Sequence, residues 1–308
     1  MPELQTPPPA RPGSPSFIQL APHWPHAEAS RFFKVGRITW HVQRLGKSGN
    51  SGRPRLLLIH GTGASTHSFM DMLTLASADH EVIAIDLPGH GFTQTPPALR
   101  PSQDNIATAL VELLDDMAFD PGVIIGHSAG AAVMLALSRK LSARDRRLVS
   151  LNGALTPFPG IAQALFPVTA QLLTLGGVTA HILSQSAQNR SRVASLLEQT
   201  GGAPDDRFID GYAALLRCRG HVSGTLRLMA NWDLTQSEAR IGQLENPILF
   251  VSGSQDTAVD PSDGDRLAAR APQGRSVRLD RVGHLAHEQD AQRVWETVEQ
   301  FIETAPAE

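Results

Sequence analysis

The chain has 308 residues, of which 41% are hydrophobic and 19% charged, and its formal net charge is −3. This composition indicates a globular protein with one large core, and the near balance of charges excludes the strong positive field that nucleic-acid binding requires. Cys218 is the single cysteine, which excludes an intrachain disulfide.

The first 30 residues are rich in proline and small polar residues, beginning MPELQTPPPARPGSPS. Such a segment buries too little apolar surface to fold as an independent unit. We therefore interpret residues 1–30 as a Pro-rich N-terminal tail that docks through Trp24. The same stretch lacks the basic region and apolar run of a secretory signal, so we expect a cytoplasmic location.

From residue 31 onward, short apolar runs alternate with helical patterns, which is typical of a mostly parallel, doubly wound α/β sheet. The stretch FFKVGRITWHVQRLG predicts an edge hairpin. Six further strands are predicted in PRLLLIHG, HEVIAIDLPG, GVIIGHS, RRLVSLNGA, NPILFVSG and RSVRLDRVG. Helices are predicted in SQDNIATALVELLDDMA, AGAAVMLALSRKLS, PSDGDRLAARA and EQDAQRVWETVEQFIE.

The regular spacing of predicted strands ends after the sixth strand. About ninety residues separate it from the seventh strand, which is too long for a simple connection. We expect residues 156–244 to form a helical cap, and residues 31–155 and 245–308 to form the core. No Asp, Glu, Lys or Arg occurs from residue 148 to 189. This stretch predicts either buried cap helices or an apolar surface for a ligand or a peripheral membrane contact. Prolines and glycines interrupt it, so no transmembrane span is expected.

The stretch GHSAG at residues 126–130 follows a predicted buried strand and opens a predicted helix, the context of a nucleophile elbow. A serine hydroxyl is a weak nucleophile that needs a base and an acid to orient the base. Asp256 follows the strand PILFVSG, and His284 follows the last strand. We predict that Ser128 is the nucleophile, His284 the general base and Asp256 the orienting acid.

The loop HGTG at residues 60–63 follows another predicted strand and can offer backbone amides to a developing oxyanion. We predict the amides of Thr62 and Ala129 as the two donors. His60 and His127, which flank these loops, are interpreted as structural hydrogen-bonding residues. Asp86 in DLPGHG is interpreted as a carboxylate that fixes its loop.

Other acidic residues and histidines compete for the same roles. Asp260 and Asp263 are interpreted as a loop residue and a helix N-terminal residue. His287 is expected to start a helix or to pack on the surface, because only His284 directly follows the strand and glycine. HLAHE does not have the His-Glu-x-x-His order of a zinc site, so we predict no metal site.

The motifs HGTG, DLPGHG, GHSAG, GSQD and GHLAHE resemble those of the α/β-hydrolase superfamily over nearly the whole length from Arg31. A narrower resemblance is carried by WPHAEASRFFKVGRITWHVQRLG, LLLIHGTGASTHSF, DLPGHGFT, GHSAGAAV, LNGAL and HVSGTLRLMANWDL. These stretches resemble the magnesium-chelatase accessory hydrolases of bacteriochlorophyll biosynthesis in photosynthetic bacteria. The resemblance implies a role near the insertion of magnesium into protoporphyrin, with magnesium chelatase as a partner.

The cap carries aromatic and other large residues that either face a flat apolar ligand or pack in its interior. The candidate pocket residues are Phe158, Phe166, Tyr212, His221, Met229 and Trp232. Among these, His221 is the one candidate for an axial ligand of a porphyrin-bound magnesium.

The motifs together predict a serine hydrolase of the esterase type that acts on a bulky apolar substrate such as a porphyrin ester. Two alternatives stay open. One is a porphyrin carrier or chelatase-docking protein with an idle triad, and the other is a haloperoxidase-like or carbon–carbon bond hydrolase. Dehalogenase activity is disfavoured because the nucleophile position holds Ser128, not Asp. No dinucleotide or phosphate-loop motif is present, so no cofactor is predicted.

Overall fold

The computed structural model describes residues 3–4, 6–46, 52–96, 98–143, 145–156, 177–202 and 204–304. Within them, one sheet has the strand order β1-β2-β4-β3-β5-β6-β7-β8. The strands are β1 (Ser30–Val35), β2 (Ile38–Leu45), β3 (Leu56–Ile59), β4 (Val82–Ile85), β5 (Val123–His127), β6 (Arg147–Leu151), β7 (Ile248–Gly253) and β8 (Gly274–Leu279).

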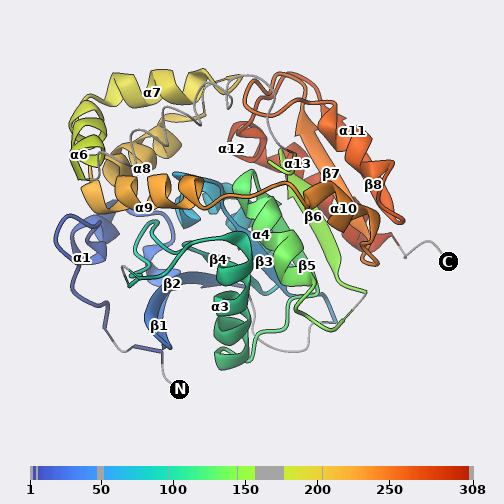
Figure 1. Cartoon of the computed structure of the whole chain (residues 1–308), viewed down its shortest axis with the longest axis horizontal. Coiled ribbons are helices and arrows are strands. Elements are labelled where there is room, and N and C mark those ends of the chain that lie inside the picture. Colours follow the sequence, from blue (N-terminus) through green and yellow to red (C-terminus); the bar gives the residue numbers. More distant parts are fainter. Residues whose placement is uncertain are drawn as a thin grey trace.

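The β1–β2 hairpin and the β2–β4 pair are antiparallel, and every other pair in the sheet is parallel. The parallel strands need crossover connections, which the helices between them provide. The expected mostly parallel α/β sheet with an edge hairpin is therefore confirmed (Figure 1).

Helices cover both faces of the sheet because the side chains of each strand alternate between two cores. In β3, Leu57 and Ile59 belong to one core, and Leu56 and Leu58 belong to the other. The first core includes residues of α3 (Gln103–Asp116), α4 (Ala129–Ser138), α10 (Ser237–Gly242) and α11 (Asp263–Ala268). The second includes residues of η3 (Thr66–Phe69), α2 (Met70–Ala76), α12 (Ala286–Gln289) and α13 (Ala291–Glu303).

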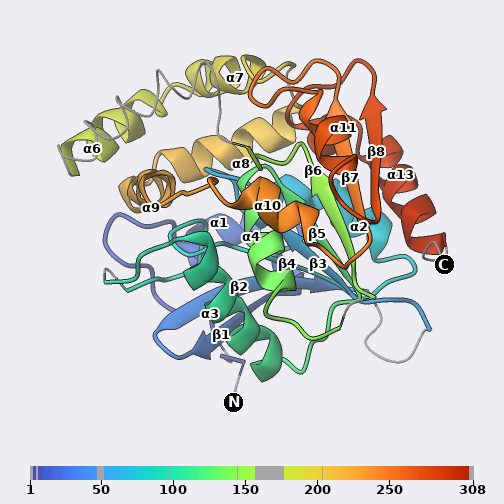
Figure 2. The same ribbon diagram turned by 45° about the vertical axis from the view of Figure 1, so that its right-hand side comes forward.

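Further helices lie between β6 and β7, where the sequence predicts the cap. They are α6 (Gly177–Ser186), α7 (Arg190–Glu198), α8 (Asp206–Leu216) and α9 (Arg219–Ala230). In both views these four helices gather on the same side of the molecule (Figures 1 and 2). Among the helices of the described ranges, none combines the length and the apolar character that crossing a bilayer demands.

The N-terminal segment lies against the rest of the molecule through short helical turns, α1 (Phe17–Leu20), η1 (Ala21–His23) and η2 (Ala27–Ala29). Trp24 is buried in a cluster with Phe32, Phe92 and Leu215, which come from β1, the loop after β4 and the cap helix α8. The segment thus gains its order from contacts with the core and the cap.

Candidate active site

Ser128 lies at the sharp turn between β5 and α4. Its backbone has φ 51° and ψ −118°, a conformation that L-residues rarely adopt and that costs on the order of 1–3 kcal/mol. The Ser128 amide donates to the carbonyl of Leu151 on the neighbouring strand β6, at 3.0 Å. The sheet and the helix therefore hold the strained turn, as a nucleophile elbow requires.

Two glycines let the elbow fit against its neighbours. A Cβ on Gly130 would lie 2.1 Å from the carbonyl oxygen of Ile59, and one on Gly126 would lie 2.6 Å from the amide nitrogen of Ala131. Real Cβ atoms do not approach backbone atoms this closely. The spacing of glycines around Ser128 is thus a packing requirement of the strand–turn–helix unit.

The structure brings Ser128, His284 and Asp256 together from three separate loops. His284 Nε2 is 2.9 Å from Ser128 Oγ, and His284 Nδ1 is 2.9 Å from Asp256 Oδ2. Because the carboxylate accepts from Nδ1–H, the Nε2 lone pair faces the serine hydroxyl. This arrangement can remove the serine proton and stabilise the resulting imidazolium.

Asp256 is buried, and four hydrogen-bond donors hold its carboxylate. Oδ1 accepts from the amides of Ala258 and Val259, at 2.8 and 2.9 Å. Oδ2 accepts from Asn152 Nδ2 at 2.8 Å as well as from His284. These hydrogen bonds therefore hold the carboxylate in place, facing the imidazole.

The two competing carboxylates make other contacts. Asp260 caps its own loop by accepting from the amide and hydroxyl of Ser262. Asp263 accepts from the hydroxyl of Thr156 and pairs with Arg266. Neither contacts His284 in the described structure, which leaves Asp256 as its acidic partner.

The amides of Thr62 and Ala129 have no hydrogen-bond acceptor among the residues that the structure describes. Ala129 is the first residue of α4, where amides have no partner within the helix. The HGTG loop lies against the elbow, since a Cβ on Gly61 would lie 2.9 Å from Ser128 Cβ. The two amides are thus available for the predicted role as oxyanion donors.

His60 and Asp86 hold the loops around the site, in agreement with their interpretation as structural residues. His60 Nε2 accepts from the Leu87 amide at 2.9 Å, and Nδ1 donates to the Gly61 carbonyl at 2.7 Å. Asp86 accepts from the amide of Thr66, in the loop after β3, at 2.8 Å. Although burial acts to raise the pKa of Asp86, pairing with His41 and other contacts bring it down to about 2.

A buried polar cluster, formed by Ser68, Tyr212, His287 and Glu288, adjoins the elbow, since the ring centroids of His287 and His127 are 4.4 Å apart. The hydroxyls of Ser68 and Tyr212 both donate to Glu288 Oε1, Tyr212 at 2.8 Å. His287 Nε2 donates to Ser68 Oγ at 2.9 Å. Burial raises the pKa of Glu288 to about 8 and lowers the pKa of His287 to about 3.

The structure decides between the two alternatives expected for His287 and adds residues that the sequence did not single out. His287 does lie in the first turn of α12, but its ring is fully buried, not at the surface. Asn152 and Glu288 were not predicted as site residues. Their positions in the sequence were the available signal: Asn152 follows the strand beside β7, and Glu288 lies four residues after His284.

The candidate cap pocket is not assembled as expected within the described residues. Tyr212 is buried against His67 with its hydroxyl on Glu288, and Trp232 packs on the core of the sheet. Met229 is half-buried in the last turn of α9. Phe158 and Phe166 lie outside the described residues.

His221 is buried and both of its ring nitrogens are engaged in hydrogen bonds, which disfavours the axial-ligand role considered for it. Nδ1 accepts from the Gly91 amide at 3.1 Å, and Nε2 donates to the Gly63 carbonyl at 3.0 Å. The ring therefore ties α9 to two loops of the core. Across the described ranges, no group of three or more His, Cys, Asp or Glu side chains is arranged to hold a metal ion.

Comparisons with known proteins agree with this architecture. The chain is 35% identical to the magnesium-chelatase 30 kDa subunit of Rhodobacter capsulatus, over 87% of this chain and 93% of that protein. It is 24% identical to the esterase YbfF of Escherichia coli strain K12, over 80% of this chain and 92% of that protein. The solved structure of the enol-lactonase from Burkholderia xenovorans LB400 superposes with a TM-score of 0.70 at 20% identity, over 89% of this chain and all of that one.

At 20% identity, the likeness to this solved structure shows the fold alone. The 35% identical relative and the family match also show the family. The family described as the alpha/beta hydrolase fold matches residues 54–291, which include all three residues brought together at the elbow. The strand order, the elbow and this match lead to one conclusion: the chain belongs to the alpha/beta hydrolase fold family.

Proposed function

We propose that the protein is a serine hydrolase of the esterase type, which transfers an acyl group from its substrate to Ser128 and then to water. The observation that carries the proposal is the pair of 2.9 Å contacts of His284, one to Ser128 Oγ and one to Asp256 Oδ2. Hydrolase relatives such as the esterase YbfF support the same class of reaction.

In the first half-reaction, His284 Nε2 takes the hydroxyl proton as Ser128 Oγ attacks the acyl carbon. The amides of Thr62 and Ala129 stabilise the negative charge that develops on the acyl oxygen. The imidazolium then gives its proton to the leaving alkoxide, which departs as an alcohol. Asp256 stays ionised and stabilises the charged imidazole throughout.

In the second half-reaction, His284 takes a proton from water as the water oxygen attacks the acyl-enzyme. The bond between the acyl carbon and Ser128 Oγ breaks, the proton returns to Oγ, and a free acid is released. These steps need no redox or metal chemistry, because each is an acyl or proton transfer among residues already in contact.

For the biological role, we propose that the protein acts as a magnesium-chelatase accessory factor in bacteriochlorophyll biosynthesis, on a bulky apolar substrate such as a porphyrin ester. The support is the 35% identity to a protein named as a magnesium-chelatase subunit. The absence of charged residues from 148 to 189 supports an apolar ligand. Magnesium chelatase is the proposed partner, in a cytoplasmic setting with peripheral membrane contact.

Labelling with a fluorophosphonate tests the catalytic proposal. We expect the wild-type chain to be labelled, Ser128→Ala to be unlabelled, and His284→Ala to be labelled at least 100-fold more slowly because the base is lost. Ser195→Ala, at an exposed serine on α7, is the matched control and should be labelled normally. Labelling that survives in Ser128→Ala, or proceeds at the normal rate in His284→Ala, would refute the assignment.

The name of the Rhodobacter capsulatus relative favours a second candidate, because a chelatase subunit need not catalyse hydrolysis. In this alternative the fold binds a porphyrin or docks on the chelatase while the triad is idle. A deletion strain in which the Ser128→Ala variant replaces the wild-type protein separates the carrier from the hydrolase. Full recovery of pigment would support the carrier, whereas loss of pigment with normal protein levels would support the hydrolase.

A further inference from the structure

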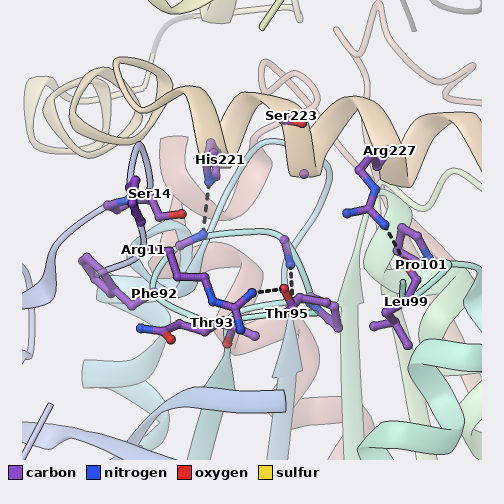
Figure 3. Close-up of a pocket in the computed structure, with 18 residues that line it drawn as sticks. Arg11, Ser14, Phe92, Thr93, Thr95, Leu99, Pro101, His221, Ser223 and Arg227 are labelled. Atoms are coloured by element: carbon purple, nitrogen blue, oxygen red, sulfur yellow. Dashed lines mark hydrogen bonds between the residues drawn. The ribbon is translucent and has the colours of Figure 1, made fainter. Parts of the chain in front are cut away.

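A cavity of about 260 Å³ lies outside the triad, between the N-terminal segment, the loop after β4 and the helix α9 (Figure 3). Its lining contains none of Ser128, Asp256, His284, Thr62 or Ala129. The proposed hydrolase mechanism therefore assigns it no role. Its volume is just below the range of about 300–1,000 Å³ that is typical of pockets for drug-sized ligands, so it suits a smaller organic molecule.

The N-terminal segment builds one wall of this cavity through specific contacts. The Gly13 carbonyl accepts from the Gly220 amide on α9 at 2.7 Å. A Cβ on Gly220 would lie 2.5 Å from Ser14 Oγ, so the two segments touch closely. Arg11 Nη1 donates to the Thr95 carbonyl at 2.5 Å, which places its guanidinium along the cavity.

The charged side chains among the described lining residues are two arginines. Arg11 comes from the N-terminal segment and Arg227 from α9, where Arg227 donates to the Leu99 carbonyl at 2.7 Å. Within the part of the chain that the structure describes, no Asp or Glu lines the cavity. His221 also lines the cavity, but burial lowers its pKa to about 4, so its ring adds no charge at neutral pH.

The remaining lining combines hydroxyl groups with apolar surface. Phe92, Leu99 and several prolines give the apolar part, and the hydroxyl-bearing residues are Ser14, Thr93, Thr95 and Ser223. A guanidinium recognises a carboxylate or a phosphate through paired N–H donors. The apolar walls favour an anion that carries a hydrocarbon body over a bare inorganic ion.

We propose that this cavity binds a small organic carboxylate, with its anionic group held by Arg11 and Arg227 and its apolar body against Phe92 and Leu99. The site neighbours the oxyanion loop without sharing residues with it, because His221 lines the cavity and donates to the Gly63 carbonyl beside Thr62. Binding here does not depend on Ser128, so this proposal and the proposed hydrolase activity can fail separately.

Isothermal titration calorimetry on the full chain tests the proposal with phenylacetate, neutral phenylacetamide and inorganic phosphate as probes. We expect phenylacetate to bind, phenylacetamide to bind at least tenfold more weakly, and the phenylacetate affinity to fall as salt screens the charges. Ser128→Ala should bind phenylacetate like the wild type. If phosphate binds more tightly than phenylacetate, the site takes a phosphoryl ligand and the proposed carboxylate is wrong.

Two sets of variants locate the site. Arg11→Gln and Arg227→Gln should each weaken phenylacetate binding at least tenfold, whereas Arg37→Gln, at an exposed arginine in the β1–β2 turn, should not. Ser223→Asp adds a negative charge to the lining and should abolish binding, while Ser223→Asn, of the same size, should retain it. Unchanged affinity in both arginine variants and in Ser223→Asp would overturn the proposal. Equal affinities for phenylacetate and phenylacetamide, or no binding by the wild type, would do the same.

Discussion

His127 Nε2 lies 3.0 Å from the carbonyl oxygen of His284, so the residue before the nucleophile holds the backbone of the proposed base. The carbonyl can only accept, so Nε2 of His127 carries the proton and donates it. Burial and the neighbouring His287 and His284 hold the pKa of His127 well below its usual value. The ring is therefore neutral and stays a fixed donor at neutral pH.

Replacing His127 should lower the catalytic rate more than the affinity for substrate. In His127→Leu the carbonyl of His284 loses its donor, so the imidazole is less well placed against Ser128, and we expect kcat to fall about tenfold with little change in KM. His127→Gln retains an N–H donor and should recover part of the rate. Ester hydrolysis kinetics measure this effect, and equal rates in the Leu and Gln variants would show that the hydrogen bond does not matter.

Asn152→Asp should shift the pH dependence of hydrolysis. Asn152 Nδ2 donates to Asp256 Oδ2 at 2.8 Å, so the substitution replaces a neutral donor with a second carboxylate of the same size. The added negative charge favours the imidazolium form of the adjacent base. We expect the acid limb of the kcat/KM profile to move to higher pH by about one unit.

The matched control for this shift is Glu198→Gln, a charge change at an exposed position on α7. It should leave the acid limb in place. An Asn152→Asp enzyme with normal folding and an unshifted profile would contradict the proposed role of the Asp256–His284 pair.

Glu288 should make the protein less stable as the pH rises from about 4.5 to about 8. Its pKa is raised from 4.5 to about 8, mainly by burial, so between these values the folded state binds a proton that the unfolded state has lost. The free energy of unfolding therefore falls with rising pH in this window, by an amount on the order of a few kcal/mol. Below pH 4.5 both states are protonated and the contribution is fully present.

Glu288→Gln tests this pH dependence, because the amide oxygen can still accept from Ser68 and Tyr212 and cannot ionise. We expect denaturant unfolding to show a smaller loss of stability between pH 5 and pH 8 in the variant. Glu198→Gln serves again as the control and should keep the wild-type slope. A Glu288→Gln slope equal to that of the wild type would mean that Glu288 is ionised in the folded protein.

Gly130→Ala should destabilise the folded protein. Its new Cβ would lie 2.1 Å from the carbonyl oxygen of Ile59, which cannot move without disturbing β3 at the centre of the sheet. We expect a loss of at least about 2 kcal/mol in the free energy of unfolding. Gly242→Ala, where the nearest atom is 4.0 Å away, is the control and should unfold like the wild type. Thermal and denaturant melts compare the two, and equal stability would contradict the close packing of the elbow.

Much of this protein could be predicted from local patterns in the sequence. The buried strands appear as short apolar runs, since both faces of a parallel sheet are covered. Ser128, Asp256 and His284 each follow a predicted strand, and parallel strands end at the same edge of a sheet. The order of these motifs was therefore enough to predict the fold and to nominate the triad.

Only the tertiary structure decided which distant polar groups meet. Tyr212 and Glu288 are 76 residues apart, and Asn152 and Asp256 are 104 apart, yet each pair shares a buried hydrogen bond. The cavity likewise combines Arg11 with Arg227, from opposite parts of the chain. Such pairs leave no periodic pattern, because they depend on how the cap and the N-terminal segment pack on the core and on the need to satisfy buried polar groups there.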